Sequence, residues 1–202
     1  KTLNERHWRS GISEAVKVAL IKDPEFFFWI EDNALGLVNR DMETMNYLIK
    51  RCAELHMQHI AGKDPFESGS SRPLDFGHWS AHKLEQLSNF EILHGEAVAM
   101  GMALDTVYSN LSGHLTDAES RRILDLLIKL GFELSHPIMQ ISANNSAILS
   151  GLEEFREHLG GELTIMLLNG IGKGLEVHKI DNEILIQASG YLKDLHLESS
   201  KA

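Results

Sequence analysis

The sequence predicts a mainly α-helical fold with a small β-hairpin near the C-terminus. Apolar residues recur with the 3.6-residue period of an amphipathic helix over most of the 202 residues. Short extended runs with a glycine-rich turn between them occur only after residue 163. No GxGxxG segment or phosphate-binding loop follows a strand-like run. We therefore expect one helical domain, residues 1–202, without a nucleotide-binding fold of its own.

Each helix is predicted from an apolar stripe and from the residues that bound it. Ile12, Val16 and Leu20 form the first stripe, and Pro24 suits the first turn of the helix that follows. The expected helices span residues 10–22, 25–34, 41–61, 76–87, 95–111, a segment capped by Thr116 or Asp117 that ends near Gly131, and 183–195. The hairpin is expected from residues 163–168 and 175–180, and residues 62–73 are expected to form a loop.

The composition excludes several classes of function. The net charge of -10 disfavours nucleic-acid binding, because a phosphate backbone requires a basic face. No apolar run approaches the roughly 20 residues of a membrane span, and the N-terminus lacks the apolar core of a secretory signal. We expect a cytoplasmic protein whose partner is a small molecule or another protein chain. The single cysteine, Cys52, is expected to be a buried thiol.

Five residues on three expected helices offer metal-binding or proton-transferring side chains. Glu14 and Lys17 lie one turn apart, His78 and His82 project to one side of their helix, and His94 begins the next helix beside a glycine that permits close backbone approach. Two imidazoles and one carboxylate with an open fourth position suit a catalytic divalent ion. Taken singly, the pieces have simpler interpretations, namely a surface ion pair and surface or capping histidines. The apolar neighbours of Glu14 argue against the first, since an unpaired carboxylate is costly to bury there.

Three segments carry a resemblance to a known family. Residues 10–23 read SGISEAVKVALIKD, residues 74–82 read LDFGHWSAH, and residues 93–102 read LHGEAVAMGM. They resemble, in the same order and spacing, the SGxAEVIKxALIxD, LNFGHTxxHA and LHGEAVAxGM segments of 3-dehydroquinate synthases, which are sugar-phosphate cyclases. Residues 170–173, GIGK, are similar to a late segment of that family. The resemblance covers residues 1 to about 180.

The resemblance implies that the chain is the helical metal- and substrate-binding domain of such an enzyme, and that the N-terminal NAD-binding α/β domain is absent from it. The cofactors would be zinc or cobalt together with NAD, and the enzyme would be a homodimer. Its reaction would convert a sugar phosphate into a carbocycle by oxidation, β-elimination of phosphate, reduction and an intramolecular aldol step. The matching residues are Glu14, His78 and His94 as metal ligands, Lys17, Arg72 and His82 as substrate contacts, Lys17 and His82 as catalytic groups, and Lys1 and Thr2 as NAD contacts.

Three departures from the family pattern leave the substrate open. His56 stands where a substrate-binding lysine is expected, Asp75 replaces an asparagine, and residues 155–157, Phe-Arg-Glu, replace Asp-Lys-Lys. Together they remove roughly three units of positive charge, which a substrate with both carboxylate and phosphate should tolerate poorly. One hypothesis is an ordinary 3-dehydroquinate synthase. A second is a valiolone synthase-type cyclase that acts on a sedoheptulose 7-phosphate-like substrate, and a third is a non-catalytic metal-binding module.

Overall fold

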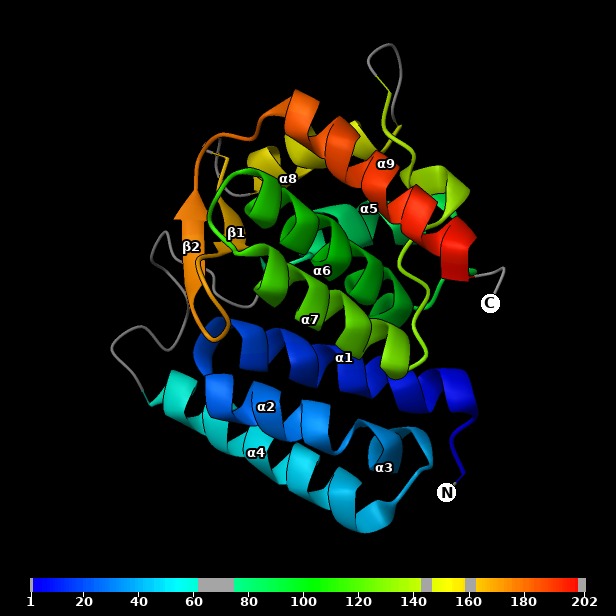
Figure 1. The fold of residues 1–202 in the computed structure, drawn as a ribbon, viewed down its shortest axis with the longest axis vertical. Helices are drawn as coiled ribbons and strands as arrows, with labels where there is room; N and C mark the ends of the chain where they lie inside the picture. The colour runs from blue at the N-terminus through cyan, green and yellow to red at the C-terminus, as the bar shows by residue number, and fades with distance from the viewer. Residues whose placement is uncertain (1, 62–74, 143–146, 159–162, 200–202) are drawn as a thin grey trace.

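A computed structural model describes residues 2–61, 75–142, 147–158 and 163–199. In this part of the chain, helices pack around a central one, and a two-stranded hairpin lies at one side (Figure 1). The helices are α1 (Glu5–Lys22), α2 (Pro24–Asp32), α3 (Ala34–Val38), α4 (Met42–Ile60), α5 (His78–Leu87), α6 (His94–Leu111), α7 (Asp117–Lys129), α8 (Ser150–His158) and α9 (Asn182–Ser199), with short 3-10 turns η2 (Pro137–Met139) and η3 (Ala147–Leu149).

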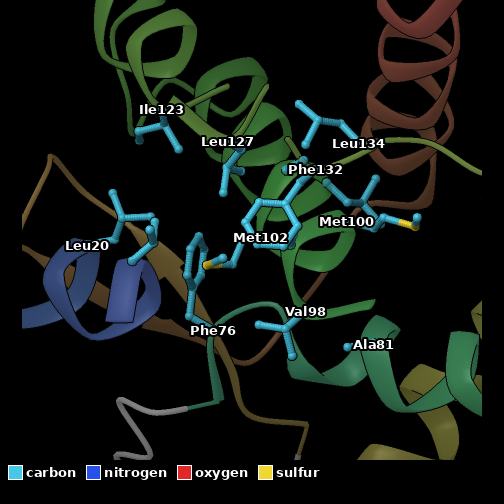
Figure 2. Close-up of a cluster of buried hydrophobic side chains, with 14 of the residues drawn as sticks. Leu20, Phe76, Ala81, Val98, Met100, Met102, Ile123, Leu127, Phe132 and Leu134 are labelled. Atoms are coloured by element: carbon cyan, nitrogen blue, oxygen red, sulfur yellow. The ribbon is translucent and has the colours of Figure 1, made fainter. Parts of the chain in front are cut away.

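The central helix is α6, and its sequence explains its position. Every residue from Ala97 to Ser109 is buried, as expected for a helix that is apolar on all sides. Helices α1, α5, α7 and α9 all pack against it. Figure 2 shows Met102 of α6 among three side chains, those of Leu20 on α1, Leu127 on α7, and Phe76, which precedes α5. One core therefore joins these helices.

Glycines on α6 allow two neighbouring segments to approach its backbone. A Cβ on Gly101 would lie 2.0 Å from the carbonyl oxygen of Gly77, and one on Gly95 would lie 2.4 Å from Cα of Ser10. Such distances leave no room for any side chain. The first turn of α5 and the middle of α1 are therefore held against α6 by direct backbone contact.

The mainly helical architecture with its C-terminal hairpin confirms the predicted fold class. Strand β1 (Ile165–Leu168) pairs antiparallel with β2 (Gly174–Val177), and Ile165 lies opposite Val177. Thr116 is the cap of α7, and its side chain exchanges hydrogen bonds with Glu119 in a capping box. Gly131, just beyond that helix, has a φ of +86°. This conformation suits glycine at a helix end.

The structure differs from the sequence prediction at several helix boundaries. Helix α1 begins at Glu5 rather than near Ser10, because Asn4 caps it by accepting a hydrogen bond from the backbone N–H of His7. Helix α5 begins at His78 rather than Phe76, since Gly77 has a left-handed φ of +76°. The short helices α3 and α8 were not predicted. The expected loop at 62–73 lies outside the described residues.

No helix in the described part of the chain is long and apolar enough to cross a membrane.

A glycine in close backbone contact and a glycine with open space around it together give a direct test of the helix packing. Gly101→Ala should destabilise the protein by about 3 kcal/mol or more, because the new Cβ would overlap the Gly77 carbonyl. Gly190→Ala on α9 is the matched control, since its Cβ would meet nothing within 4 Å and alanine favours a helix by about 0.5–1 kcal/mol. Urea unfolding of both variants measures the difference. Equal stabilities would contradict the close approach of α5 to α6.

Candidate metal centre

Glu14, His78 and His94 meet at the junction of α1, α5 and α6. One ligand atom from each lies within 4.8 Å of the other two. Oε1 of Glu14 is 3.7 Å from Nε2 of His78 and 3.4 Å from Nε2 of His94. The His78 side chain is 12% exposed and that of His94 is 46% exposed, so the group is covered on one side and open on the other.

The carboxylate of Glu14 is held ionised by its surroundings. Burial pushes its pKa upward, but Lys17, whose Nζ lies 2.6 Å from Oε2, and the two imidazoles outweigh this effect and leave the pKa below its ordinary value. The second oxygen, Oε1, is buried and has no hydrogen-bond partner among the residues that the structure describes. A buried carboxylate oxygen in this state is where a cation would be expected.

Each histidine has one ring nitrogen engaged by a neighbouring acceptor. Nδ1 of His78 lies 3.1 Å from the carbonyl oxygen of Phe76, and Nδ1 of His94 lies 3.0 Å from Oε2 of Glu85. When Nδ1–H donates to these oxygens, the Nε2 lone pairs are left facing Glu14. Burial, together with the Lys17 ammonium, lowers the pKa of His78 to about 4, so this ring is neutral at pH 7.

The donor set fits a divalent ion such as zinc or cobalt. Tetrahedral zinc with nitrogen and oxygen ligands at about 2.0–2.1 Å separates its ligand atoms by roughly 3.3–3.4 Å. The two distances from Oε1 of Glu14, 3.7 and 3.4 Å, are close to that separation. Such an ion would require Oε1 of Glu14, which has no partner among the described residues, and the Nε2 atoms of the two histidines, of which that of His78 lies 3.4 Å from Nζ of Lys17. The role of the three residues as ligands remains a prediction that this geometry supports.

A second group of possible ligands overlaps the first. His82, Glu85 and His94 also bring ligand atoms within 4.8 Å of one another. The ring of His82 lies 5.4 Å from that of His78 and is stacked at 6.0 Å on that of His94. Glu85 already accepts a hydrogen bond from His94, whereas no residue in the described part of the chain donates one to Oε1 of Glu14. We therefore favour the Glu14 group as the metal site and place His82, which is exposed, at its open side.

The other predicted site residues that the structure describes lie outside the group formed by Glu14, His78 and His94. Asp75 is half-buried, three residues before His78. His56 is exposed on α4, one turn beyond Cys52. Thr2 is exposed and lies two residues before Asn4, the cap of α1, whereas Glu14 lies about 15 Å along the helix from that cap at 1.5 Å per residue. The structure does not bring Thr2 into the group. Lys1 and Arg72 lie outside the described residues.

Cys52 is half-buried rather than fully buried, and it packs against the core. Burial raises the pKa of its thiol to about 11, and the charge of Glu14 acts in the same direction. The thiol is therefore protonated at neutral pH in the metal-free protein, and Cys52 belongs to neither of the candidate ligand groups found among the described residues.

Helix α8 covers the side of α5 next to His82. A hollow of about 90 Å³ there has Lys83, Glu154 and Phe155 among its lining residues, together with His82 itself. Lys83 donates a short hydrogen bond to Glu154, and Arg156 is 2.6 Å from Glu153. The cations on these two helices are thus matched by carboxylates.

Glu85 is the residue that the sequence interpretation missed. It lies one turn after His82 on α5, and its side chain is 16% exposed. A signal was present, because the residues at i, i+4 and i+7 from His78 share a helix face. Its partner is on another helix, however, and the pairing with His94 depends on how α5 meets α6.

The comparisons with known proteins agree with this geometry. Residues 11–151 match the family model described as 3-dehydroquinate synthase C-terminal. The chain belongs to this family. The match begins within α1 and ends at the start of α8, and it therefore includes all three members of the metal group.

Solved structures give the same fold. ValA, the 2-epi-5-epi-valiolone synthase of Streptomyces hygroscopicus subsp. jinggangensis 5008, with NAD+ and Zn2+ bound, matches with a TM-score of 0.87 and 30% identity, over 96% of this chain and 53% of that one. A 2-deoxy-scyllo-inosose synthase complexed with carbaglucose-6-phosphate, NAD+ and Co2+ matches at 0.73 and 20% identity, over 93% of this chain and 53% of that one. The last likeness bears on the fold alone. The chain spans about half the length of these proteins.

Removal of the Glu85 carboxylate should weaken the metal centre. Glu85→Ala leaves Nδ1 of His94 without its acceptor, and we expect metal affinity to fall by about 10- to 100-fold. Glu85→Gln should lose less, because its amide oxygen still accepts. Competitive titration with a chromophoric chelator measures both. Glu183→Ala, which changes an exposed glutamate on α9, is the control. If Glu85→Ala bound the metal as tightly as this control, Glu85 would have no role in orienting His94.

Proposed function

We propose that this chain is the metal- and substrate-binding part of a metal- and NAD-dependent sugar-phosphate cyclase. The observation that carries the proposal is the group formed by Glu14, His78 and His94, with a buried carboxylate oxygen that lacks a partner among the described residues. The family match supports it. NAD would be bound mainly by an N-terminal α/β domain outside this chain, and the complete enzyme would be a homodimer.

The proposed reaction conserves the oxidation level of the substrate overall. A ring hydroxyl carbon would be oxidised, a neighbouring C–H proton and inorganic phosphate would then leave by β-elimination, and the ketone would finally be reduced again. NAD, when bound, would take up the hydride in the first step and return it in the last. The ring then opens, and an aldol step forms the carbon–carbon bond of the carbocycle. A divalent ion at the centre would polarise the hydroxyl oxygen and stabilise negative charge that develops on it.

The side chains around the centre have separate tasks in this proposal. Lys17, 5% exposed at its side chain and 2.6 Å from Glu14, holds the carboxylate ionised and presents a cation to the substrate. His82, on the open side, is placed to transfer protons. Glu85 orients His94. Arg72 is a further candidate for binding the substrate's anionic groups, as the family resemblance implies.

We propose a sedoheptulose 7-phosphate-like substrate in preference to the heptulosonate from which 3-dehydroquinate is made. The heptulosonate carries a carboxylate besides its phosphate and requires additional cations. Here His56 and Asp75 stand where lysine and asparagine are expected, and Lys83 beside the site is paired with Glu154. The 30% identity to ValA supports the same choice.

The metal assignment can be tested on one ligand. His94→Ala should reduce metal affinity by at least about 100-fold, because one of three protein ligands is removed. His114→Ala, in the turn after α6, is the matched histidine control and should retain wild-type affinity. Metal content after dialysis and a cobalt titration give the readout. Undiminished binding by His94→Ala would show that the ion, if bound, lies elsewhere.

The substrate assignment requires the complete enzyme with NAD and metal. We expect turnover of sedoheptulose 7-phosphate, with release of inorganic phosphate, at a kcat/KM at least about 100-fold above that for the heptulosonate phosphate. Treatment with a chelator should abolish turnover, and added zinc or cobalt should restore it. Turnover of the heptulosonate alone would replace this proposal with a 3-dehydroquinate synthase. Metal binding without turnover of any sugar phosphate would favour the non-catalytic module.

A further inference from the structure

Asp105 is a buried carboxyl group that belongs to none of the sequence motifs. It lies in the middle of α6 and is 1% exposed. Both of its oxygens accept hydrogen bonds from the start of α5: Oδ2 from the backbone N–H of Gly77 at 3.0 Å, and Oδ1 from the indole N–H of Trp79 at 2.9 Å. The two donors belong to the residues immediately before and after His78.

The segment that Asp105 holds also sets the direction of the His78 ring. Gly77 has a φ of +76°, and a Cβ there would lie 2.7 Å from the backbone nitrogen of Met102. The ring nitrogen Nδ1 of His78 is 3.1 Å from the carbonyl oxygen of Phe76. A shift of Gly77 would therefore move both the backbone of His78 and the acceptor that orients its ring.

Burying the Asp105 carboxyl group between two helices is energetically unfavourable. Burial raises the pKa of Asp105 to about 7, although the hydrogen bonds from Trp79 and Gly77 act against the rise. Both donors are neutral, and a buried carboxylate held by neutral donors destabilises a fold relative to a well-packed apolar residue. Local features that weaken a fold are expected where a functional site requires them.

We propose that Asp105 is a positioning residue of the metal centre. Through Gly77 and Trp79 it fixes the first turn of α5 so that Nε2 of His78 faces Glu14. The inference rests on the metal-binding role of His78 in the proposed function. Asp105 lies outside the group of candidate ligands, so its effect is on metal affinity and on the geometry of the bound ion.

The test compares variants of the complete protein by cobalt and zinc titration, by the visible absorption spectrum of the cobalt form, and by the melting temperature of the metal-free form. Asp105→Asn keeps the shape of the side chain but turns an amide N–H toward one of the two donors. We expect its metal affinity to fall by about 10-fold or more, with an altered cobalt spectrum. Trp79→Phe removes one of the two hydrogen bonds and should weaken binding less.

Two control variants separate positioning from general stability. Thr106→Val changes the neighbouring residue, which is fully buried, and should leave metal affinity and spectrum unchanged. Leu192→Ala removes core packing on α9, where Leu192 is 1% exposed, and should lower the melting temperature without changing the affinity of the folded protein.

Three outcomes decide the matter. Weakened binding and a changed spectrum for Asp105→Asn, or for Trp79→Phe where the first variant does not fold, support the proposal. Unchanged affinity in folded Asp105→Asn, or an equal loss in Leu192→Ala, overturns it while the metal assignment stands. A wild-type protein that binds neither metal overturns the proposed function, and this inference with it.

Discussion

Two direct contacts between backbones determine where the metal group forms. The first turn of α5 lies against α6 at Gly77 and Gly101, and α1 lies against α6 at Ser10 and Gly95. His78 directly follows the first of these contacts, His94 directly precedes Gly95, and Glu14 is one helical turn beyond Ser10. Gly95 and Gly101 also lie on the same helix, which fixes the spacing between the two contacts. A side chain at either glycine would separate the ligands, because the nearest atom in each case, the carbonyl oxygen of Gly77 or Cα of Ser10, belongs to the backbone.

Within that geometry, the charge of Glu14 makes the centre favourable for a cation. The ionised Glu14 has one oxygen on Lys17 and one that is buried without a partner among the described residues. An unsatisfied buried group of this kind costs on the order of 1–3 kcal/mol. An ion that binds there removes the cost, and any ligand that binds only the folded state raises its stability. Metal binding at the proposed site would therefore be coupled to the packing of α1, α5 and α6 through the same few atoms.

Much of this candidate centre could be predicted from the sequence, because each candidate ligand lies within a short motif that can be read without the tertiary structure. Glu14, His78 and His94 could be named as candidate ligands from the family motifs that they occupy, and the helical period predicted His78 and His82 on one face. The role of Glu85 could not be read in this way, since its partner is on another helix and the pairing exists only after α5 and α6 meet. The same holds for the boundaries of α1 and α5, which depend on the Asn4 cap and on the left-handed Gly77.

The charges of the side chains around the candidate metal centre bear more on the proposed substrate than the shape of the centre does. Lys17 is engaged with Glu14, Lys83 with Glu154, and Arg156 with Glu153. An anionic group of a substrate that approaches Lys17 or Lys83 would have to compete with the carboxylates of Glu14 and Glu154 for these cations. Two opposite unit charges about 4 Å apart attract each other by about 4 kcal/mol at an effective dielectric constant of about 20. An anionic group that finds no cation to pair with lacks this interaction. On the proposed function, a substrate with one anionic group would therefore suit the described part of the centre better than one with two, and the residues His56 and Asp75 change the charge in the same direction.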